Sequence, residues 1–343
     1  MESEGESVDL GLEDRFLIVE KVGQGTYSSV YKALDRWNGK IVALKKVNVF
    51  KENEGLPVSF YRETRILSKM DHENVVKYHG IHRSVDNELF FILDYCENDL
   101  SSLIFKNRAK LTVSNVKFLF FQLMCAIMYV HKHDVTHRDI KPSNILVNRK
   151  GKLKITDFGL ANFLRTDGRP NTIKVASPRY RAPELLLGDT SYTKAIDMWS
   201  AGCVLYEMIT GKPVFATNTG SDMSQLDSIF KICGTPADSS IFNTLPQWKL
   251  VQLIHRYPSA LESHLKTHIP IEYSFAIPIL HKLLVLEPEN RATAEELYQD
   301  MSTYKYDLED LSVHHIISTS HFPIIQELDS LGPLRADPPL ILC

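Results

Sequence analysis

Cysteine is scarce in this sequence and shows no paired spacing. The five cysteines are scattered and odd in number, and no two of them form a C-x-x-C pair; they are Cys96, Cys125, Cys203, Cys233 and Cys343. A disulfide framework or a zinc site requires paired or closely spaced cysteines, so the pattern argues against both. We therefore expect an intracellular protein in a reducing compartment.

Long hydrophobic runs and a strong net charge are also absent. The most apolar run, residues 116–130, contains Lys117 and Gln122, and we expect it to be too short to cross a bilayer. Lysine and arginine number 39 against 42 aspartates and glutamates, a net charge of −3, which argues against nucleic acids or anionic membranes as general partners. The first 14 residues contain six acids and no base, unlike a signal peptide, and we expect residues 1–15 to form a flexible acidic tail.

What the sequence does contain is enough apolar material for a large core. The chain has 343 residues and is 44% hydrophobic, so we expect one bilobal unit or two domains. From Phe16 the pattern is strand-like, with hairpin signals at Asn38-Gly39 and Asp86-Asn87. Residues 116–130 carry an apolar stripe at helical spacing, and residues 196–209 are apolar almost all round, which predicts a buried helix.

The stretch HRDIKPSNIL, residues 137–146, is followed eleven residues later by DFG and carries the chemistry. Asp139 can accept a proton from a substrate hydroxyl, Lys141 can neutralise charge on a moving phosphate, and Asn144 and Asp157 can hold a metal ion. Phosphoryl transfer requires positioning and charge neutralisation, so these residue types suffice. Either triplet alone could be an ordinary polar turn, but here both occur in order and at the required spacing.

Two glycines, Gly23 and Gly25, lie between predicted strands, and Lys45 follows in the strand-like VALK. Glycine has no Cβ and lets backbone N–H groups approach the phosphates of a nucleotide, although a lone G-x-G is also an ordinary hairpin turn. A half-buried lysine needs an anionic partner. We expect Glu63, on a helix predicted over residues 55–70, to provide it, the alternative being a solvated glutamate on a helix face.

From Phe16 to about Tyr304 the sequence resembles a eukaryotic serine/threonine protein kinase, and within that superfamily a cyclin-dependent kinase. The motifs that carry the resemblance cover most of the chain; they are GQGTY, VALKKV, HRDIKPSNIL, DFGLA, YRAPELLLG, IDMWSAGCV and CGTP. The resemblance implies an α+β, bilobal fold, with a small, mainly antiparallel β N-lobe carrying one key helix and a larger, mainly α-helical C-lobe. The N-lobe would cover about residues 16–95 and the C-lobe about 96–304, leaving 305–343 as a C-terminal extension.

The resemblance also assigns ATP and Mg²⁺ as cofactors. It makes Asp139 the catalytic base with Lys141 beside it, and Asn144 and Asp157 the magnesium ligands. Backbone groups of a hinge segment would bind the adenine, and an aspartate would lie near the ribose. The ATP-binding positions implied by the resemblance are Val22, Gly23, Gln24, Gly25, Thr26, Tyr27, Ser28, Ser29, Val30, Lys45, Glu63, Asp94, Cys96 and Asp99.

Regulation is predicted from the segment that follows DFG. Thr172 stands in the register of the family's activating phosphorylation site, and Arg62 and Arg138 match two of the positions that bind its phosphate. The third position is Asn162, which brings no charge, with Arg165 nearby. We therefore expect an activating phosphorylation with a weaker effect than is usual in the family.

Substrate choice is predicted from Ala176 and Arg181, which match the positions that shape the pocket for the residue after the phosphorylated Ser or Thr. A proline there would leave no N–H donor stranded. The chain departs from the family at Ser28, where the third loop glycine is expected, and at residues 177–179, where Thr-Leu-Trp is usual and Ser-Pro-Arg is found.

The predicted helix over residues 55–70 is similar to the one by which these kinases dock a cyclin-like regulatory subunit. KENEGLP at 51–57 and HENVV at 72–76 look more like the transcription-associated branch, whose members phosphorylate the C-terminal domain (CTD) of RNA polymerase II, which implies a nuclear location. The alternatives are a cell-cycle member, a catalytically silent scaffold and a mitogen-activated kinase. The catalytic residues are all present, which argues against the scaffold, and residues 172–174 lack the Thr-x-Tyr pair of the mitogen-activated kinases.

Overall fold

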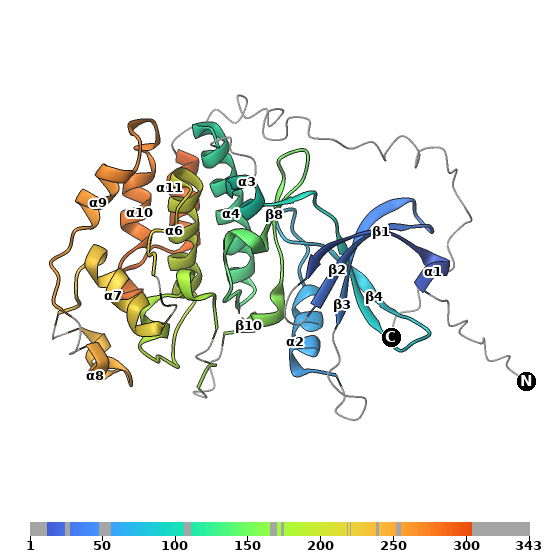
Figure 1. Ribbon diagram of the computed structural model, residues 1–343, viewed down its shortest axis with the longest axis horizontal. Coiled ribbons are helices and arrows are strands. Elements are labelled where there is room, and N and C mark those ends of the chain that lie inside the picture. The colour runs from blue at the N-terminus through green and yellow to red at the C-terminus, as the bar shows by residue number, and fades with distance from the viewer. Residues whose placement is uncertain are drawn as a thin grey trace, which may run out of the picture. The chain divides into compact units, whose positions relative to one another are not determined.

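The computed structural model describes residues 12–24, 28–47, 56–105, 111–164, 170–172, 175–217, 219, 221–237, 240–251 and 255–303. The chain divides into two compact units, and Figure 1 labels many of their helices and strands. The first unit contains the described residues up to Tyr61 together with Val76–Tyr95, and the second contains Arg62–Val75 and the described residues from Cys96 onward. The lobe boundaries expected at residues 16, 95 and 304 stay predictions.

A five-stranded antiparallel sheet forms the first unit, in the order β1-β2-β3-β5-β4. Its core consists of alternate strand residues that point to one face, among them Phe16, Ala33, Leu44 and Ile92, each at most 2% exposed. A short helix, α1 (Leu12–Arg15), precedes the sheet. The strands are β1 (Phe16–Gln24), β2 (Ser28–Asp35), β3 (Lys40–Val47), β4 (Tyr78–Arg83) and β5 (Leu89–Asp94).

Both predicted hairpins are present in this sheet. Gly39 has φ +68° in the turn between β2 and β3, and Asn87 has φ +61° in the turn between β4 and β5. Glycine and asparagine are the residues that tolerate this left-handed conformation best. The local sequence therefore fixes where these strands end.

Helix α2 (Val58–Leu67) is shorter than the helix expected over residues 55–70, because residues 56–57 and 68–70 are not helical; residue 55 lies outside the described residues. Pro57 lies just before it, and the Pro57 carbonyl accepts a hydrogen bond of 2.9 Å from the Phe60 N–H. Phe60, Ile66 and Leu67 are buried, whereas Val58 is 72% and Tyr61 59% exposed. The helix thus buries one face and leaves two large apolar side chains in solvent.

Three long helices form the centre of the second unit: α4 (Val113–Lys132), α6 (Ala195–Thr210) and α11 (Ala294–Thr303). Figure 1 shows them side by side, and α4 contacts both of the others. Residues 196–209 of α6 are all buried, which confirms the helix predicted there. Gly202 of α6 is a close-approach position, because a Cβ there would lie 2.9–3.0 Å from Leu284 and Leu283 at the C-terminal end of α10 (Ala276–Leu283).

Helix α4 is longer than the sequence suggested. It has 20 residues and is long and apolar enough to cross a membrane by length and composition, so the expectation that its apolar run is too short was wrong. Its apolar stripe faces the interior of the unit, where Val116, Leu119, Leu123 and Ile127 are at most 1% exposed. The composition of α4 is therefore that of a core helix.

Short elements complete the second unit. Three strands pair in the order β6-β8-β9 and two in the order β10-β7. The remaining strands are β6 (Asn98–Asp99), β7 (Val135–Thr136), β8 (Ile145–Val147), β9 (Leu153–Ile155) and β10 (Asn162–Phe163); the remaining helices are α3 (Leu100–Phe105), α5 (Pro183–Leu186), α7 (Asp222–Cys233), α8 (Trp248–Val251) and α9 (Leu261–His268); and the 3₁₀ helices are η1 (Pro142–Asn144), η2 (Phe158–Leu160), η3 (Pro178–Tyr180), η4 (Ile241–Thr244), η5 (Ile271–Tyr273) and η6 (Pro288–Asn290).

Candidate active site

The loop between β7 and β8 carries Asp139, Lys141 and Asn144, and the structure brings all three together. Lys141 Nζ lies 2.7 Å from Asp139 Oδ2, and Asn144 Nδ2 donates to the same oxygen at 2.9 Å and to the Asp139 carbonyl at 3.0 Å. Asp139 is 5% and Asn144 6% exposed. The spacing in HRDIKPSN therefore does place a carboxylate, a cation and an amide at one point.

Ser177 is a fourth member of this cluster that the sequence reasoning had recorded only as a departure from the family. Its backbone N–H and its Oγ donate to Asp139 Oδ1 at 3.1 and 3.0 Å, and Lys141 Nζ donates to Ser177 Oγ at 3.0 Å. The segment before YRAPE thus contacts the catalytic loop directly. The available signal was the hydroxyl that Ser177 shares with the usual threonine.

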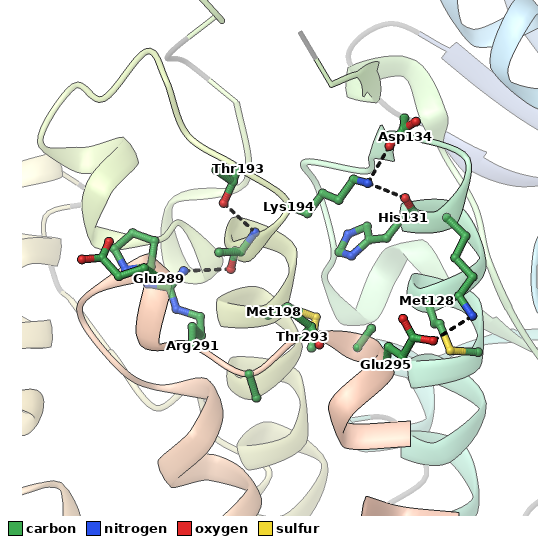
Figure 2. Close-up of a pocket in the computed structure, with 15 residues that line it drawn as sticks. Met128, His131, Asp134, Thr193, Lys194, Met198, Glu289, Arg291, Thr293 and Glu295 are labelled. Carbon is green, nitrogen blue, oxygen red and sulfur yellow. Dashed lines mark hydrogen bonds and ion pairs between the residues drawn. The ribbon is translucent and has the colours of Figure 1, made fainter. Parts of the chain in front are cut away.

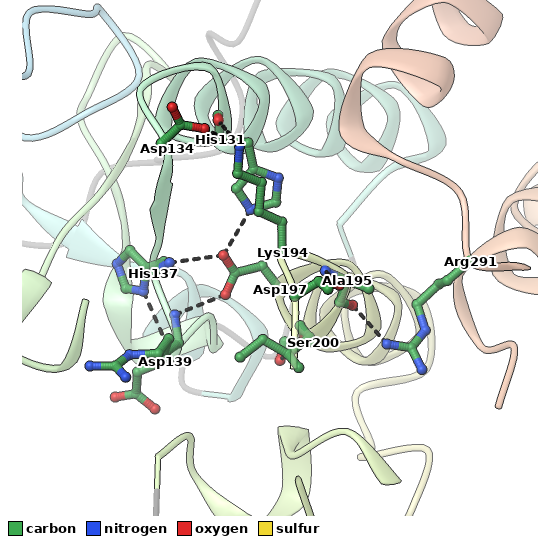
Figure 3. A network of polar contacts seen from close by, with 12 residues as sticks. His131, Asp134, His137, Asp139, Lys194, Ala195, Asp197, Ser200 and Arg291 are labelled. Carbon is green, nitrogen blue, oxygen red and sulfur yellow. Dashed lines mark hydrogen bonds and ion pairs between the residues drawn. The ribbon is translucent and has the colours of Figure 1, made fainter. Parts of the chain in front are cut away.

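Asp197 of α6 anchors the backbone of the catalytic loop (Figure 3). It is 1% exposed and accepts hydrogen bonds of 2.8 Å from the N–H groups of His137 and Arg138, and its Oδ2 lies 2.9 Å from His131 Nε2. Burial raises the pKa of Asp197, but the hydrogen bond and charge of His131, the charge of His137 and the Arg138 N–H together outweigh it, so the pKa lies below the ordinary value. The available sequence signal was an acid in the first turn of a mostly apolar helix.

Two residues of the motifs adopt the left-handed conformation without being glycine. Arg138 of HRD has φ +68° and Asp157 of DFG has φ +64°. Such backbone is uncommon for these side chains and persists where surrounding contacts hold it. Arg138 is held by its N–H bond to Asp197 and by Nε donating to the Leu160 carbonyl at 2.5 Å. The strain coincides with the predicted catalytic motifs.

Asn144 and Asp157 lie at the same end of the β8–β9 hairpin. Asn144 directly precedes β8, Asp157 follows β9 by two residues, and Ile145 pairs with Ile155 in antiparallel register. Because Asn144 Nδ2 bonds to Asp139, its amide oxygen is the atom left for another ligand. Mg²⁺ prefers hard oxygen ligands and commonly uses one or two from the protein together with phosphates. The two residues therefore fit Mg²⁺, and no cluster of three or more His, Cys, Asp or Glu suited to a metal occurs in the described part of the chain.

Glu63, expected to pair with Lys45, is 6% exposed on α2. A Cβ at Gly159 of DFG would lie 3.5 Å from Glu63 Oε2 and 3.4 Å from Asp157 Oδ1, so both carboxylates approach this glycine. The ion pair between Glu63 and Lys45 stays a prediction.

Within the sheet, three of the predicted nucleotide-binding residues stand in one row. Gly23 of β1 pairs with Val30 of β2, and Val30 pairs with Lys45 of β3. Val22 and Gln24 belong to β1, Ser29 to β2, and Asp94 ends β5. The strands thus hold the glycine segment and the lysine in fixed register, as VALK behind a G-x-G predicts.

The remaining residues predicted to bind the nucleotide are Asp99, Cys96 and four residues of the glycine segment. Asp99, expected near a ribose, caps α3, because its two carboxylate oxygens accept hydrogen bonds of 2.9 and 2.7 Å from the N–H and Oγ of Ser102. Cys96 is half-buried in the second unit. Gly25, Thr26, Tyr27 and Arg165 lie outside the described residues, and of Ser28 only the backbone is described.

Thr172 is exposed, as a phosphorylation site requires, and its backbone carbonyl is hydrogen-bonded. The Tyr192 hydroxyl donates to the Thr172 carbonyl at 2.9 Å and accepts a hydrogen bond of 2.9 Å from Arg138 Nη1. Arg62 is half-buried on α2, and Asn162 pairs with β7 in a two-stranded ladder. Tyr192 was not singled out from the sequence, where it is one of several tyrosines.

Ala176 and Arg181 are in direct contact. Ala176 has φ +62°, and its carbonyl accepts a hydrogen bond of 2.9 Å from Arg181 Nη2, while the Val175 carbonyl accepts one of 3.0 Å from Arg181 Nε. Asp222 of α7 lies 2.7 Å from Arg181 Nη1 and orients the guanidinium. Both carbonyls of this segment are therefore already occupied.

A cavity of about 490 Å³ lies between the end of α4, the start of α6 and the start of α11 (Figure 2). Met128, Met198 and the aliphatic parts of two ion-paired lysines, Lys132 and Lys194, contribute to its wall. It reaches the catalytic loop through His131, the partner of Asp197, and includes none of the predicted catalytic residues. We assign it no role in the chemistry.

Comparisons with known proteins agree with this geometry. The family model described as protein kinase domain matches residues 16–301. Human cyclin-dependent kinase 10 is 37% identical over 281 residues, covering 80% of this chain and 76% of that protein. Among solved structures, the yeast RNA Pol II CTD kinase CTDK-1 complex gives a TM-score of 0.76 at 34% identity and covers 87% of this chain and 93% of that chain. The CAK complex of Chaetomium thermophilum bound to ATP-gamma-S also gives 0.76, at 31% identity, covering 84% and 90%.

The chain belongs to the protein kinase family. Within that family it is a member of the cyclin-dependent kinases, which confirms the fold and the family expected from the motifs. It spans between 25% and 49% of the length of several other curated relatives that it matches.

Proposed function

We propose that this chain is the catalytic subunit of a cyclin-dependent serine/threonine protein kinase. It transfers the γ-phosphate of ATP, with Mg²⁺, to Ser or Thr followed by Pro. The observation that carries the proposal is the Asp139 carboxylate, which receives hydrogen bonds from Lys141, Asn144 and Ser177 at 2.7–3.1 Å. Such a preorganised carboxylate suits the orientation of a substrate hydroxyl, which is the protein's main task in phosphoryl transfer.

The residues divide the work as follows. Asp139 accepts the proton of the substrate hydroxyl, and Lys141, held between Asp139 and Ser177, neutralises charge on the transferred phosphate. Asn144 and Asp157 would hold magnesium, and bound Mg·ATP supplies the phosphoryl group and charge neutralisation. Asp197 holds the catalytic loop in place by accepting hydrogen bonds from the N–H groups of His137 and Arg138.

The occupied carbonyls of Val175 and Ala176 support the preference for proline. The carbonyls of Val175 and Ala176 are both directed at Arg181, so a substrate backbone N–H would lose its water partner at this surface without a carbonyl aimed at it. Proline has no N–H and carries no such cost. This cost, of about 1–3 kcal/mol for one unsatisfied group, corresponds to roughly a fivefold to hundredfold preference.

The polymerase CTD is the proposed substrate, and the nucleus the proposed site of action. The heptad repeats of that domain contain Ser-Pro sites, and a structural neighbour at 34% identity is named as a CTD kinase. A cyclin-like partner is proposed to dock on α2, where Val58 and Tyr61 are exposed and a contact could move Glu63 toward Lys45.

The test is a comparison of wild type with Asp139→Asn and Asp134→Asn, each with its partner bound. Asp134 lies just before β7, on the other side of that strand from the catalytic loop, and pairs with Lys194 at the surface, so it is the control. We expect Asp139→Asn to lose nearly all single-turnover transfer while ATP binding changes little, and Asp134→Asn to resemble wild type. Transfer by Asp139→Asn at the wild-type rate would refute the assignment.

Phosphoryl-transfer assays on the wild-type complex also test the preference for proline. Heptad peptides with Pro or Ala after the acceptor Ser should differ in kcat/KM in favour of Pro. Equal values would remove the proline preference but leave the kinase assignment intact.

A further inference from the structure

Tyr192 lies between the end of α5 and the start of α6 and is 5% exposed. Its hydroxyl has one proton and two lone pairs. The proton is donated to the Thr172 carbonyl, and one lone pair accepts Arg138 Nη1, each at 2.9 Å. Burial raises the pKa of Tyr192 despite the opposing charge of Arg138, so the hydroxyl stays protonated at neutral pH.

Arg138 is the fixed end of this connection. Its backbone N–H is bound by Asp197, its Nε donates to the Leu160 carbonyl, and the next residue is Asp139. The other end is Thr172, which is itself the predicted phosphorylation site. The bond uses the carbonyl of Thr172, so it does not depend on what the exposed Thr172 side chain carries.

We propose that the Tyr192 hydroxyl is a positioning group that holds residue 172 against Arg138 when Thr172 is unphosphorylated, and so supports a basal activity. The proposal rests on the proposed kinase function and specifies its regulation. A phosphate on Thr172 performs the same task more strongly, because charge-assisted hydrogen bonds to arginine exceed a neutral one.

The expected effect of phosphorylation follows if the segment around Thr172 has two states, docked against Arg138 or undocked. When a phosphate already keeps the docked population near its maximum, losing one hydroxyl bond changes that population little. Without the phosphate, the docked population is fractional, and the same loss lowers activity almost in proportion. The hydroxyl therefore matters most before phosphorylation.

The experiment compares wild type with Tyr192→Phe, each with partner bound, with Thr172 either unphosphorylated or phosphorylated by an activating kinase. Phenylalanine keeps the ring and removes the hydroxyl. The substitution removes both hydrogen bonds of the hydroxyl, and only the one to the Thr172 carbonyl holds the segment directly. We expect kcat/KM of the unphosphorylated form to fall about fivefold to tenfold, and that of the phosphorylated form to fall less than about twofold. In the Thr172→Ala background, which keeps the carbonyl, Tyr192→Phe should cost as much as in the unphosphorylated enzyme.

Tyr273→Phe is the matched control. Tyr273 is also 5% exposed, and its hydroxyl donates to a backbone carbonyl, that of Leu111, at 2.6 Å. Both substitutions should lower Tm by a similar amount, but only Tyr192→Phe should raise the ratio of phosphorylated to unphosphorylated kcat/KM.

An equal loss in both phosphorylation states, or no loss in the unphosphorylated state, would overturn the inference while the kinase function stands. Absence of activity from wild type in both states would overturn the proposed function and the inference with it.

Discussion

Ser177 completes the hydrogen bonding of the catalytic carboxylate from outside the catalytic loop. Asp139 Oδ2 is bound by Lys141 and Asn144, whereas Oδ1 is bound by the backbone and the hydroxyl of Ser177. A carboxylate held at both oxygens has little rotational freedom. The orientation of the base therefore depends on the segment before YRAPE as well as on its own loop.

This contact predicts the effect of removing the hydroxyl. Ser177→Ala keeps the N–H bond to Asp139 and loses the Oγ bonds to Asp139 and Lys141, so we expect kcat to fall about tenfold, with KM for ATP nearly unchanged. Ser177→Thr retains the hydroxyl and should restore most of the rate. Steady-state kinetics on a heptad peptide measure both, and a wild-type kcat in Ser177→Ala would show that the Oγ bonds do not matter.

The sequence was enough to predict Asp139, Lys141 and Asn144, because these three residues are close in the chain and lie in one short loop. Ser177, Tyr192 and Asp197 were missed as contributors because each acts on the catalytic loop across more than 35 residues of chain. The sequence shows that these three residues are polar, but the tertiary packing of the chain decides which residues they contact. The signals available in the sequence were the acid Asp197 in a mostly apolar helix and the hydroxyl that Ser177 shares with the usual threonine.

Helix α6 contains two buried acids whose pKa values move in opposite directions. That of Asp197 is lowered, since His131, the charge of His137 and the Arg138 N–H together outweigh its burial. That of Glu207 is raised by burial, and its hydrogen bond from Tyr180 Oη, 2.7 Å, and the charge of Arg179 only partly oppose it. The number of donors aimed at each carboxylate decides the sign.

The raised pKa of Glu207 predicts a pH-dependent gain from Glu207→Gln. A carboxyl that binds its proton more tightly when folded lowers stability as pH rises from its ordinary value of 4.5 to its raised value. Glutamine does not titrate and can still accept the Tyr180 hydrogen bond. We expect Tm of the variant minus Tm of wild type to be larger at about pH 7.5 than at about pH 4.

Glu262→Gln is the control of opposite sign. The pKa of Glu262 is lowered by hydrogen bonds from Lys266 and His281, so Glu262 contributes stability above its ordinary pKa, and this contribution is lost as pH falls. The variant should therefore be less stable than wild type at neutral pH and equal to it in acid. Thermal unfolding that gives the same pH trend for both variants would contradict the Glu207 argument.

Element positions were largely predictable because they depend on local patterns. The apolar stripe of α4 identified the helix, and Asn38-Gly39 and Asp86-Asn87 identified two turns. The stripe over residues 116–130 did not give the start of α4, because a capping box between Thr112 and Asn115 starts the helix before its first buried residue. Element ends are thus set by side-chain to backbone contacts that hydrophobic periodicity does not report.

For the whole molecule, the exposed face of α2 predicts dependence on a partner. We expect the isolated chain to be at least about tenfold less active than the complex, because binding shifts α2 toward the arrangement that pairs Glu63 with Lys45. Tyr61→Ala should weaken partner binding by about 1–2 kcal/mol, since large exposed apolar side chains that become buried contribute most to an interface.

Val58→Ala and Val85→Ala form a matched pair for this prediction. Val58, on α2, is 72% exposed, and Val85, in the β4–β5 turn, is 62% exposed. Titration calorimetry with the purified partner should show weaker binding for Val58→Ala alone. Full activity of the isolated chain, or equal affinities for the two variants, would remove α2 as the docking face.

Helix α4 has a consequence for how the protein is made. Its buried stripe is covered by α6 and α11, and α11 ends about 170 residues after α4 does. At roughly 5–20 residues per second, the ribosome completes that cover on the order of 10–30 s after α4 is synthesised. During this interval the apolar stripe of α4 has none of its cover from α11, so we expect the nascent chain to be most prone to aggregation between the synthesis of α4 and that of α11.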